Sequence, residues 1–126
     1  MKSRWINHRG EEIFYVDFSN FLLNRDLFKA ELEAVLLTVS QTPERTVLGL
    51  VDVRNTALSM AMTALIKGYA RRMGRHIRKA AVIVNENTEA KKNLLSAIAR
   101  VGGREVVLFE NTEEAKDWLV ENSNRS

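Results

Sequence analysis

Residues 46–73 read TVLGLVDVRNTALSMAMTALIKGYARRM, and this stretch decides the fold. Its first part contains five apolar side chains, Val47, Leu48, Leu50, Val51 and Val53. The one charge among them, Asp52, comes near the end of the run. Such a run is typical of a parallel strand that is buried on both faces. The segment is therefore predicted to be the central strand of a sheet.

The polar residues Arg54, Asn55 and Thr56 follow this strand and predict a turn, and Thr56 is expected to cap the next helix. The inner stripe of that helix is predicted to be Leu58, Ala61, Met62, Leu65, Tyr69 and Met73. Ligands of open α/β sheets usually bind at the carboxyl ends of the strands. We therefore expect a functional site to lie at this turn.

The rest of the chain alternates between strand and helix patterns. Residues 5–8 and 11–18 predict two strands joined by a turn at Arg9-Gly10, because glycine adopts the positive φ that a hairpin requires. A helix is predicted between Asn24 and Pro43, with Phe28, Leu32, Val35, Leu36 and Val39 inside and Lys29, Glu31 and Glu33 outside. Further strands are predicted at residues 80–84 and 104–109, with helices after each.

The predicted order is ββαβαβαβα, which favours an α/β fold with a single, mixed, mostly parallel sheet and an N-terminal hairpin. The length of 126 residues suits one domain, expected to span residues 1–121 with a frayed tail at 122–126. The chain contains no cysteine, so we expect neither disulfides nor cysteine-ligated metal. Neither a signal peptide nor a membrane span is expected, and the predicted location is the cytoplasm.

Four segments resemble the STAS superfamily, and more closely its SpoIIAA-like branch. They are HRGEEIFYVDFSN (8–20), LGLVDVRN (48–55), AAVIVN (80–85) and VVLFENTEEAKDWL (106–119). The resemblance covers nearly the whole chain and implies a small bacterial, non-enzymatic α/β domain that acts through binding, as a regulatory, protein-interacting switch component or as a ligand-binding module. This branch is also likened to lipid-carrying domains of the CRAL-TRIO type, which implies an apolar pocket.

In anti-sigma-factor antagonists, an Asp-Ser-Ser-Gly motif at the start of the second helix contains a serine that a partner kinase phosphorylates. The corresponding residues here are Leu58-Ser59-Met60-Ala61, so only Ser59 matches. The aspartate and the glycine of the motif are missing. The resemblance therefore implies Ser59 as the candidate phosphorylation site.

The candidate ligand- or partner-binding residues are Asp52, Arg54, Asn55, Thr56, Ser59 and Met62. Arg54 and the free N–H groups at the helix start could bind an anion, with Asp52 orienting them. Alternatively, Asp52 accepts backbone hydrogen bonds within the turn and has no ligand. An enzyme with an unrecognised site around Asp52, Arg54 and Ser59 is a third hypothesis.

Other chemistries are not expected. A phospho-accepting Asp52 of the receiver type would need an acidic pair to hold magnesium, and only Asp17 lies near the first two strand ends. His8 and His76 are the only histidines, and neither phosphate-loop motif, GxxxxGK[ST] or GxGxxG, occurs. We therefore expect no catalytic residues, no metal and no cofactor.

A basic cluster is predicted to form a surface for anionic partners. It consists of Lys67, Arg71, Arg72, Arg75, Arg78 and Lys79. Residues 64–126 contain 12 Lys/Arg against 8 Asp/Glu, whereas residues 1–63 contain 7 against 8, so the basic excess is local. Nucleic acid is not expected, because aromatic residues are not interleaved with the charges apart from Tyr69. The alternative to a binding surface is that these basic residues are solvated side chains at the carboxyl end of a helix, where the helix dipole favours cations.

The runner-up function is a carrier or sensor of a small apolar or anionic molecule between the second helix and the central strand. Small residues, Ala57, Ala61, Ala64 and Gly68, are expected to leave room there. Met60, Met62 and Met73 could adapt to an irregular ligand. A homodimer through the apolar residues 21–23 is a further alternative.

Overall fold

A five-stranded sheet forms the middle of the molecule in the computed structural model, which describes residues 1–22, 24–57, 59–86, 88–102 and 106–121. The strands are β1 (Arg4–His8), β2 (Glu11–Asp17), β3 (Val47–Asp52), β4 (Ile77–Ile83) and β5 (Val106–Phe109). They lie side by side in chain order. β1 and β2 are antiparallel, and the other neighbouring pairs are parallel. The predicted mixed sheet with a central third strand is confirmed.

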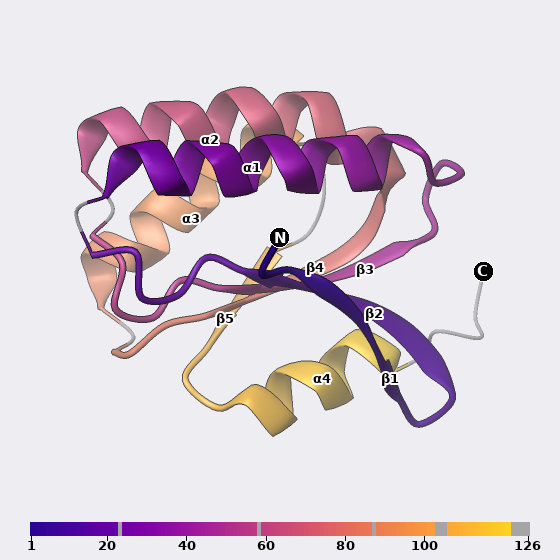
Figure 1. Ribbon diagram of the computed structural model, residues 1–126. Coiled ribbons are helices and arrows are strands. Elements are labelled where there is room, and N and C mark those ends of the chain that lie inside the picture. Colours follow the sequence, from indigo (N-terminus) through magenta and orange to yellow (C-terminus); the bar gives the residue numbers. More distant parts are fainter. Residues whose placement is uncertain (23, 58, 87, 103–105, 122–126) are drawn as a thin grey trace.

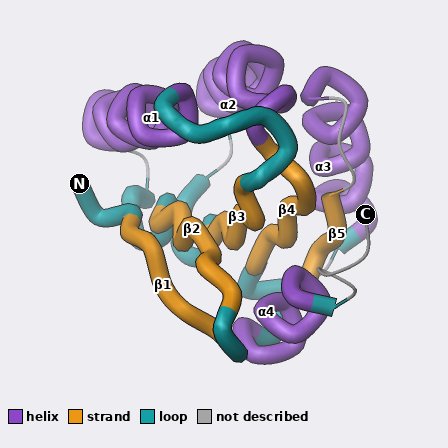
Figure 2. Tube along the Cα trace, turned by 90° about the vertical axis from the view of Figure 1, so that its right-hand side faces the viewer, coloured by secondary structure: helices purple, strands orange, loops and turns teal. Residues whose placement is uncertain are grey.

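Helices cover both faces of this sheet, but unequally. One face carries α1 (Arg25–Ser40), α2 (Met60–Met73) and α3 (Glu89–Gly102), and the other carries α4 (Thr112–Val120) (Figures 1 and 2). A short 3₁₀ turn, η1 (Gly74–His76), leads into β4. Strands β2 to β5 are adjacent and parallel, so right-handed crossovers place all three connecting helices on the same face.

The hairpin turn at Arg9-Gly10 is formed as predicted. Both residues have positive φ, 53° and 83°, as a two-residue type I′ turn requires. In the register that this turn sets, Ile6 lies opposite Ile13. Side chains of β2 then alternate between the two faces: Phe14 belongs to the core under α1 to α3, and Ile13 to the core beside α4.

The inner stripe predicted for the first helix is confirmed, with Phe28, Leu32, Val35 and Val39 buried and Leu36 packed against them. The prediction that Glu31 faces solvent was wrong, because its side chain is only 7% exposed. Its carboxylate accepts hydrogen bonds from the backbone N–H groups of Lys2 and Ser3, at 3.1 and 2.9 Å, and from the Ser3 hydroxyl at 2.7 Å. Glu31 therefore fastens the start of the chain to α1.

The stripe predicted for the second helix is only partly correct. Met62 and Tyr69 are buried, and Leu65 and Met73 are half-buried against the core, but Ala61 is exposed. Leu58 lies outside the described residues, as do the side chains predicted to line the third helix, Ala90, Leu94, Ala97, Ile98 and Val101. The cap of α2 is Ser59, whose hydroxyl accepts from the Met62 N–H at 3.2 Å. The prediction that Thr56 caps this helix was wrong.

Candidate functional site

The loops that follow β2 and β3 run side by side at the carboxyl edge of the sheet. Backbone N–H groups of Phe18, Asn20 and Leu22 donate to the carbonyls of residues 52, 54 and 55 at 2.9 to 3.1 Å. Thr56 joins the same two loops, because its hydroxyl donates to the Phe18 carbonyl at 2.5 Å and accepts from the Phe21 N–H at 3.0 Å. These bonds hold both loops in one conformation, which explains why Thr56 is not available as a helix cap.

Asp52 is buried on the side of the sheet that α4 covers, with 1% of its surface exposed. Its carboxylate accepts from the Arg54 guanidinium at 2.7 and 3.0 Å and from the Tyr15 hydroxyl at 2.6 Å. Burial by itself would raise the pKa of Asp52, but the hydrogen bonds from Arg54 and Tyr15 outweigh it, so the pKa is lowered. Asp52 and Arg54 therefore neutralise each other within the protein.

Asn55 and Thr56 lie elsewhere, in a groove of about 1090 Å³ between the ends of β3 and β4 and the helices α2 and α3. Leu22, Met60, Lys67 and Lys91 also line this groove. Of the six residues predicted to form the site, only Asn55 and Thr56 are part of this lining.

Two apolar side chains at this groove are unusually exposed, Leu22 by 67% and Met60 by 91%. Leu22 has a φ of 56°, which is unfavourable for a bulky residue. Asn55 is held by its N–H, which donates to Asn85 Oδ1 at 2.8 Å, and by its side-chain amide, which donates to Asn20 Oδ1 at 2.9 Å. The groove is thus built from a fixed loop, two lysines and exposed apolar groups, and its described lining includes no carboxylate.

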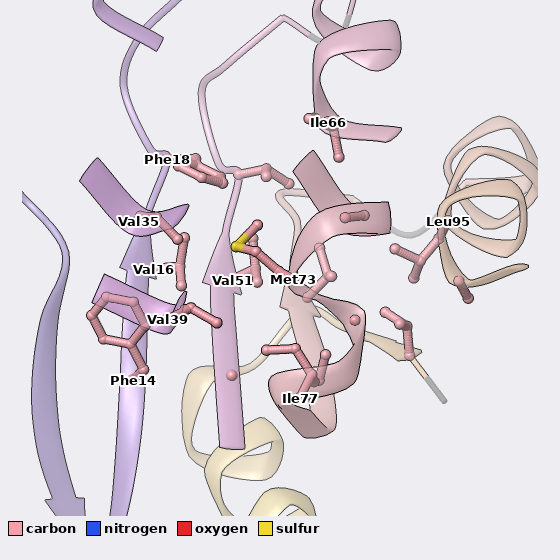
Figure 3. A pocket seen from close by; sticks show the side chains of 18 of the residues that line it. Phe14, Val16, Phe18, Val35, Val39, Val51, Ile66, Met73, Ile77 and Leu95 are labelled. Carbon is pink, nitrogen blue, oxygen red and sulfur yellow. The ribbon is translucent and has the colours of Figure 1, made fainter. Parts of the chain in front are cut away.

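An apolar cavity of about 160 Å³ lies beside the groove, between the sheet and the helices α1, α2 and α3 (Figure 3). Val16 and Val51 point into it from the strands, Val35 and Val39 from α1, and Met73 from α2. Within the described part of the chain, every side chain of its lining is apolar except Lys91. The prediction of a space between the second helix and the central strand therefore has a structural counterpart.

The residues that make room for the cavity are not those expected. Five small residues line it: Gly49, Ala70, Gly74, Ala80 and Ala99. By contrast, Ala61, Ala64 and Gly68 are exposed, and Ala57 and Ala64 line the outer groove. Gly49 was a missed signal, because glycine inside a strand often marks a place that another group approaches closely.

The cavity and the groove adjoin each other. Val53, Val84 and Lys91 line both of them. Val53 and Val84 directly follow the central strands β3 and β4, and Lys91 is in the first turn of α3. The three residues therefore mark the boundary where an apolar interior meets a polar opening.

The structure does not bring the six residues of the predicted basic cluster onto one surface. Arg71 and Arg72 are exposed in the last turn of α2. Lys79 instead extends toward α4, where its Nζ donates to the Trp118 carbonyl at 2.5 Å and lies 4.1 Å from the centre of the Trp118 ring. Arg75 is exposed and its Nε contacts His76 Nε2 at 3.3 Å. Arg78 on β4 is half-buried.

The two histidines contact different parts of the protein. His8 Nε2 is 2.8 Å from Asp117 Oδ1 on α4, and the buried His76 has Nδ1 at 2.9 Å from the Thr42 carbonyl oxygen. Among the described residues, no group of three or more His, Asp or Glu side chains is placed to hold a metal ion.

None of the described helices is long and apolar enough to cross a membrane. No protein-family model, curated protein or solved structure matches the chain. The resemblance to the SpoIIAA-like branch of the STAS superfamily therefore stays a prediction.

Proposed function

We propose that this protein is a non-enzymatic binding module that holds a small apolar molecule in the cavity beneath α1, α2 and α3. The observation that carries the proposal is the cavity of about 160 Å³ with its apolar lining. The contacts of Asp52 with Arg54 and Tyr15, and of Ser59 with the Met62 N–H, support a structural role for both residues over a catalytic one.

The size of the cavity sets the size of the ligand. An apolar cavity of about 150 Å³ in another protein stays dry and binds benzene. Each buried CH₂ group contributes about 0.8 kcal/mol, so a ligand with roughly six carbons gains about 5 kcal/mol. That corresponds to a dissociation constant on the order of 0.1 mM. The fitting ligand is thus a single ring or a short chain.

A pair of substitutions on α2 tests this proposal. Ala70 lines the cavity and Ala61 is exposed, so Ala70→Leu fills the space and Ala61→Leu makes the same change outside it. Added 1-hexanol should raise the melting temperature of the wild type and of Ala61→Leu, because a ligand that binds only the folded state stabilises it. It should leave the melting temperature of Ala70→Leu unchanged. Equal shifts in all three proteins, or no shift in the wild type, would refute the proposal.

A second candidate function is the regulatory, protein-interaction role that the resemblance implies, with a cytoplasmic location. It is favoured by the exposed side chains of Leu22 and Met60, which offer an apolar contact surface. Ser59 is also exposed and directly precedes Met60, so its phosphorylation would place negative charge on this surface.

Native mass spectrometry of the purified full chain separates the two candidates. A bound small molecule favours the carrier or sensor, and an unmodified mass together with a co-purifying protein favours the interaction module. In the second case Met60→Glu should abolish the protein complex, because a charge then replaces an apolar contact. The Lys92→Glu variant is the matched surface control, since Lys92 is exposed and does not line the groove.

A further inference from the structure

We infer that the ligand is a small amphiphile with one anionic head group, whose apolar part occupies the cavity and whose head group lies at Lys91 in the adjoining groove. This inference rests on the proposed function, and it adds the chemical class of the ligand. Three observations support it: the position of Lys91, the composition of the groove, and the three residues, Val53, Val84 and Lys91, that line both spaces.

Lys91 is the one charged residue among the described residues that line the cavity, and it also lines the groove. Its side chain is half-buried. A lysine in this position packs its aliphatic stem against apolar surface and directs its ammonium group to the polar side. The aliphatic stem of Lys91 thus forms part of the cavity wall, and its ammonium group lies where the cavity meets the groove.

The ammonium group of Lys91 has no hydrogen bond or ion pair with any other described residue, and only its backbone N–H is engaged, by Thr88 Oγ1 at 3.3 Å. No acidic residue stands three or four positions away on either side in the sequence. Lys91 also lies in the first turn of α3, where the helix dipole disfavours a cation. A bound anion would therefore relieve an unfavourable charge.

The groove around Lys91 is suited to an anionic group. Lys67 of α2 adds a second, half-buried cation, and neither neighbour at i±4, Thr63 or Arg71, is acidic. Hydroxyl and amide groups of Thr63, Asn85 and Thr88 line the same space and can donate hydrogen bonds. The described lining contains two cations and no anion, so it discriminates against a cationic ligand.

A ligand that fits both the cavity and the groove must be an amphiphile and not a simple anion. An inorganic anion would leave the apolar cavity empty, and a hydrocarbon would leave both lysines without an anionic partner among the described residues that line the groove. Val53 and Val84, which line both spaces, lie where the head group joins the apolar part. The cavity volume limits that apolar part to about the size of benzene.

The test compares three probes of matched chain length, hexanoate, 1-hexanol and hexylammonium, titrated calorimetrically into the full chain at neutral pH and low salt. Hexanoate should bind about tenfold more tightly than 1-hexanol, since hydrogen bonds to charged groups are the stronger ones. Hexylammonium should bind more weakly than 1-hexanol. Added salt should weaken the binding of hexanoate and leave that of 1-hexanol nearly unchanged.

Variants of two adjacent lysines locate the head group. Lys91→Met keeps an unbranched apolar stem and removes the charge, so it should abolish the preference for hexanoate while 1-hexanol still binds. Lys91→Arg should retain the preference. Lys92→Met is the matched control, because Lys92 is the exposed neighbour on the same helix and lines neither space.

The results distinguish this inference from the proposed function. If 1-hexanol binds but hexanoate binds no more tightly, the inference is wrong and the apolar cavity remains a binding site. If Lys92→Met lowers the preference as much as Lys91→Met, the head group is not bound at Lys91. If neither hexanoate nor 1-hexanol binds to the wild type, the proposed function fails and this inference fails with it. Binding of 1-hexanol to Lys91→Met shows that this variant is folded.

Discussion

The hydroxyl of Tyr15 on β2 lies 2.6 Å from Oδ2 of Asp52 at the end of β3, and it donates a hydrogen bond to this buried carboxylate. The guanidinium of Arg54 binds the same carboxylate. These contacts connect two neighbouring strands on the side of α4, away from the apolar cavity. The Asp52–Arg54 pair is therefore expected to contribute to stability, whereas the groove and the cavity are where we propose that a ligand binds.

Tyr15 predicts a loss of stability at alkaline pH. Burial, together with the hydrogen bond and charge of Asp52, raises the pKa of Tyr15 from 10.0 to about 12. The neutral hydroxyl is thus favoured in the folded state, so its contribution is present below pH 10.0 and is lost between pH 10.0 and about 12. Tyr15→Phe should cost about 1.5–3 kcal/mol at neutral pH. It should also flatten the decline in stability over the alkaline range, as measured by urea unfolding.

Tyr69→Phe is the control for that experiment. The Tyr69 hydroxyl is 3.3 Å from Glu33 Oε1, a longer contact than the one between Tyr15 and Asp52. Its removal should therefore cost less at neutral pH. An equal cost for the two variants would contradict the special role of the buried Asp52.

Asp52 predicts the opposite behaviour, a loss of stability in acid. Its pKa in the folded protein lies below the ordinary value of 3.8, so its contribution is present above that value and is lost as the pH falls through the folded-state pKa. Asp52→Asn should lower the unfolding free energy at neutral pH by about 1–3 kcal/mol. It should also make the acid side of the stability profile shallower. Glu44→Gln, at an exposed loop position, should leave the profile of the wild type unchanged.

Alanine substitutions at two glycines distinguish the effect of filling the cavity from the general effect of replacing glycine in the backbone. Gly49 lines the cavity, and among the described residues a Cβ there would meet only the Lys79 carbonyl oxygen, at 3.9 Å, whereas a Cβ at the exposed Gly68 would meet no described atom within 4 Å. Alanine at either position should stabilise the free protein by about 0.5–1 kcal/mol. Only Gly49→Ala should weaken 1-hexanol binding, as measured by calorimetry. Weaker binding in Gly68→Ala would argue against the location of the site.

Substitutions of Ser59 and Thr56 are expected to change hydrogen exchange at different backbone amides. Ser59→Ala removes the cap of α2, should cost about 1 kcal/mol, and should speed hydrogen exchange at the Met62 amide. Thr56→Ala removes the bond to the Phe21 N–H and should instead speed exchange at the Phe21 amide. Amide exchange measured by NMR distinguishes the two. Faster exchange of the Met62 amide in Thr56→Ala would indicate that Thr56 caps α2, contrary to the assignment of Ser59.

Local patterns in the sequence were enough to predict the order of elements, the Arg9-Gly10 hairpin, the central strand and the buried stripe of α1. Each depends on neighbours in the chain: the period of apolar residues, a positive φ or a short buried run. The same information misplaced Glu31. Its contacts are with Lys2 and Ser3, 29 and 28 positions away, and no local pattern reports such a partner.

The candidate site was only partly predictable. The carboxyl edge of β3 was the expected place, and Asn55 and Thr56 do line a groove there. Alternation along a strand already implies that Asp52 and its neighbour Val53 point to opposite faces. What the sequence did not reveal was which face the three crossover helices would cover, and so which of the two residues would border the cavity.

The sequence by itself determined that this protein is an α/β domain built on residues 47–53, because the periodicity of apolar side chains is a local property. Only the tertiary structure decided that Asp52 is neutralised within the protein, that Lys91 borders both an apolar cavity and a polar groove, and that Gly49, Ala70 and Ala80 make room for the cavity. The physical reason is that a cavity is the volume left unfilled when side chains from distant segments pack together. No single segment of the chain specifies that volume.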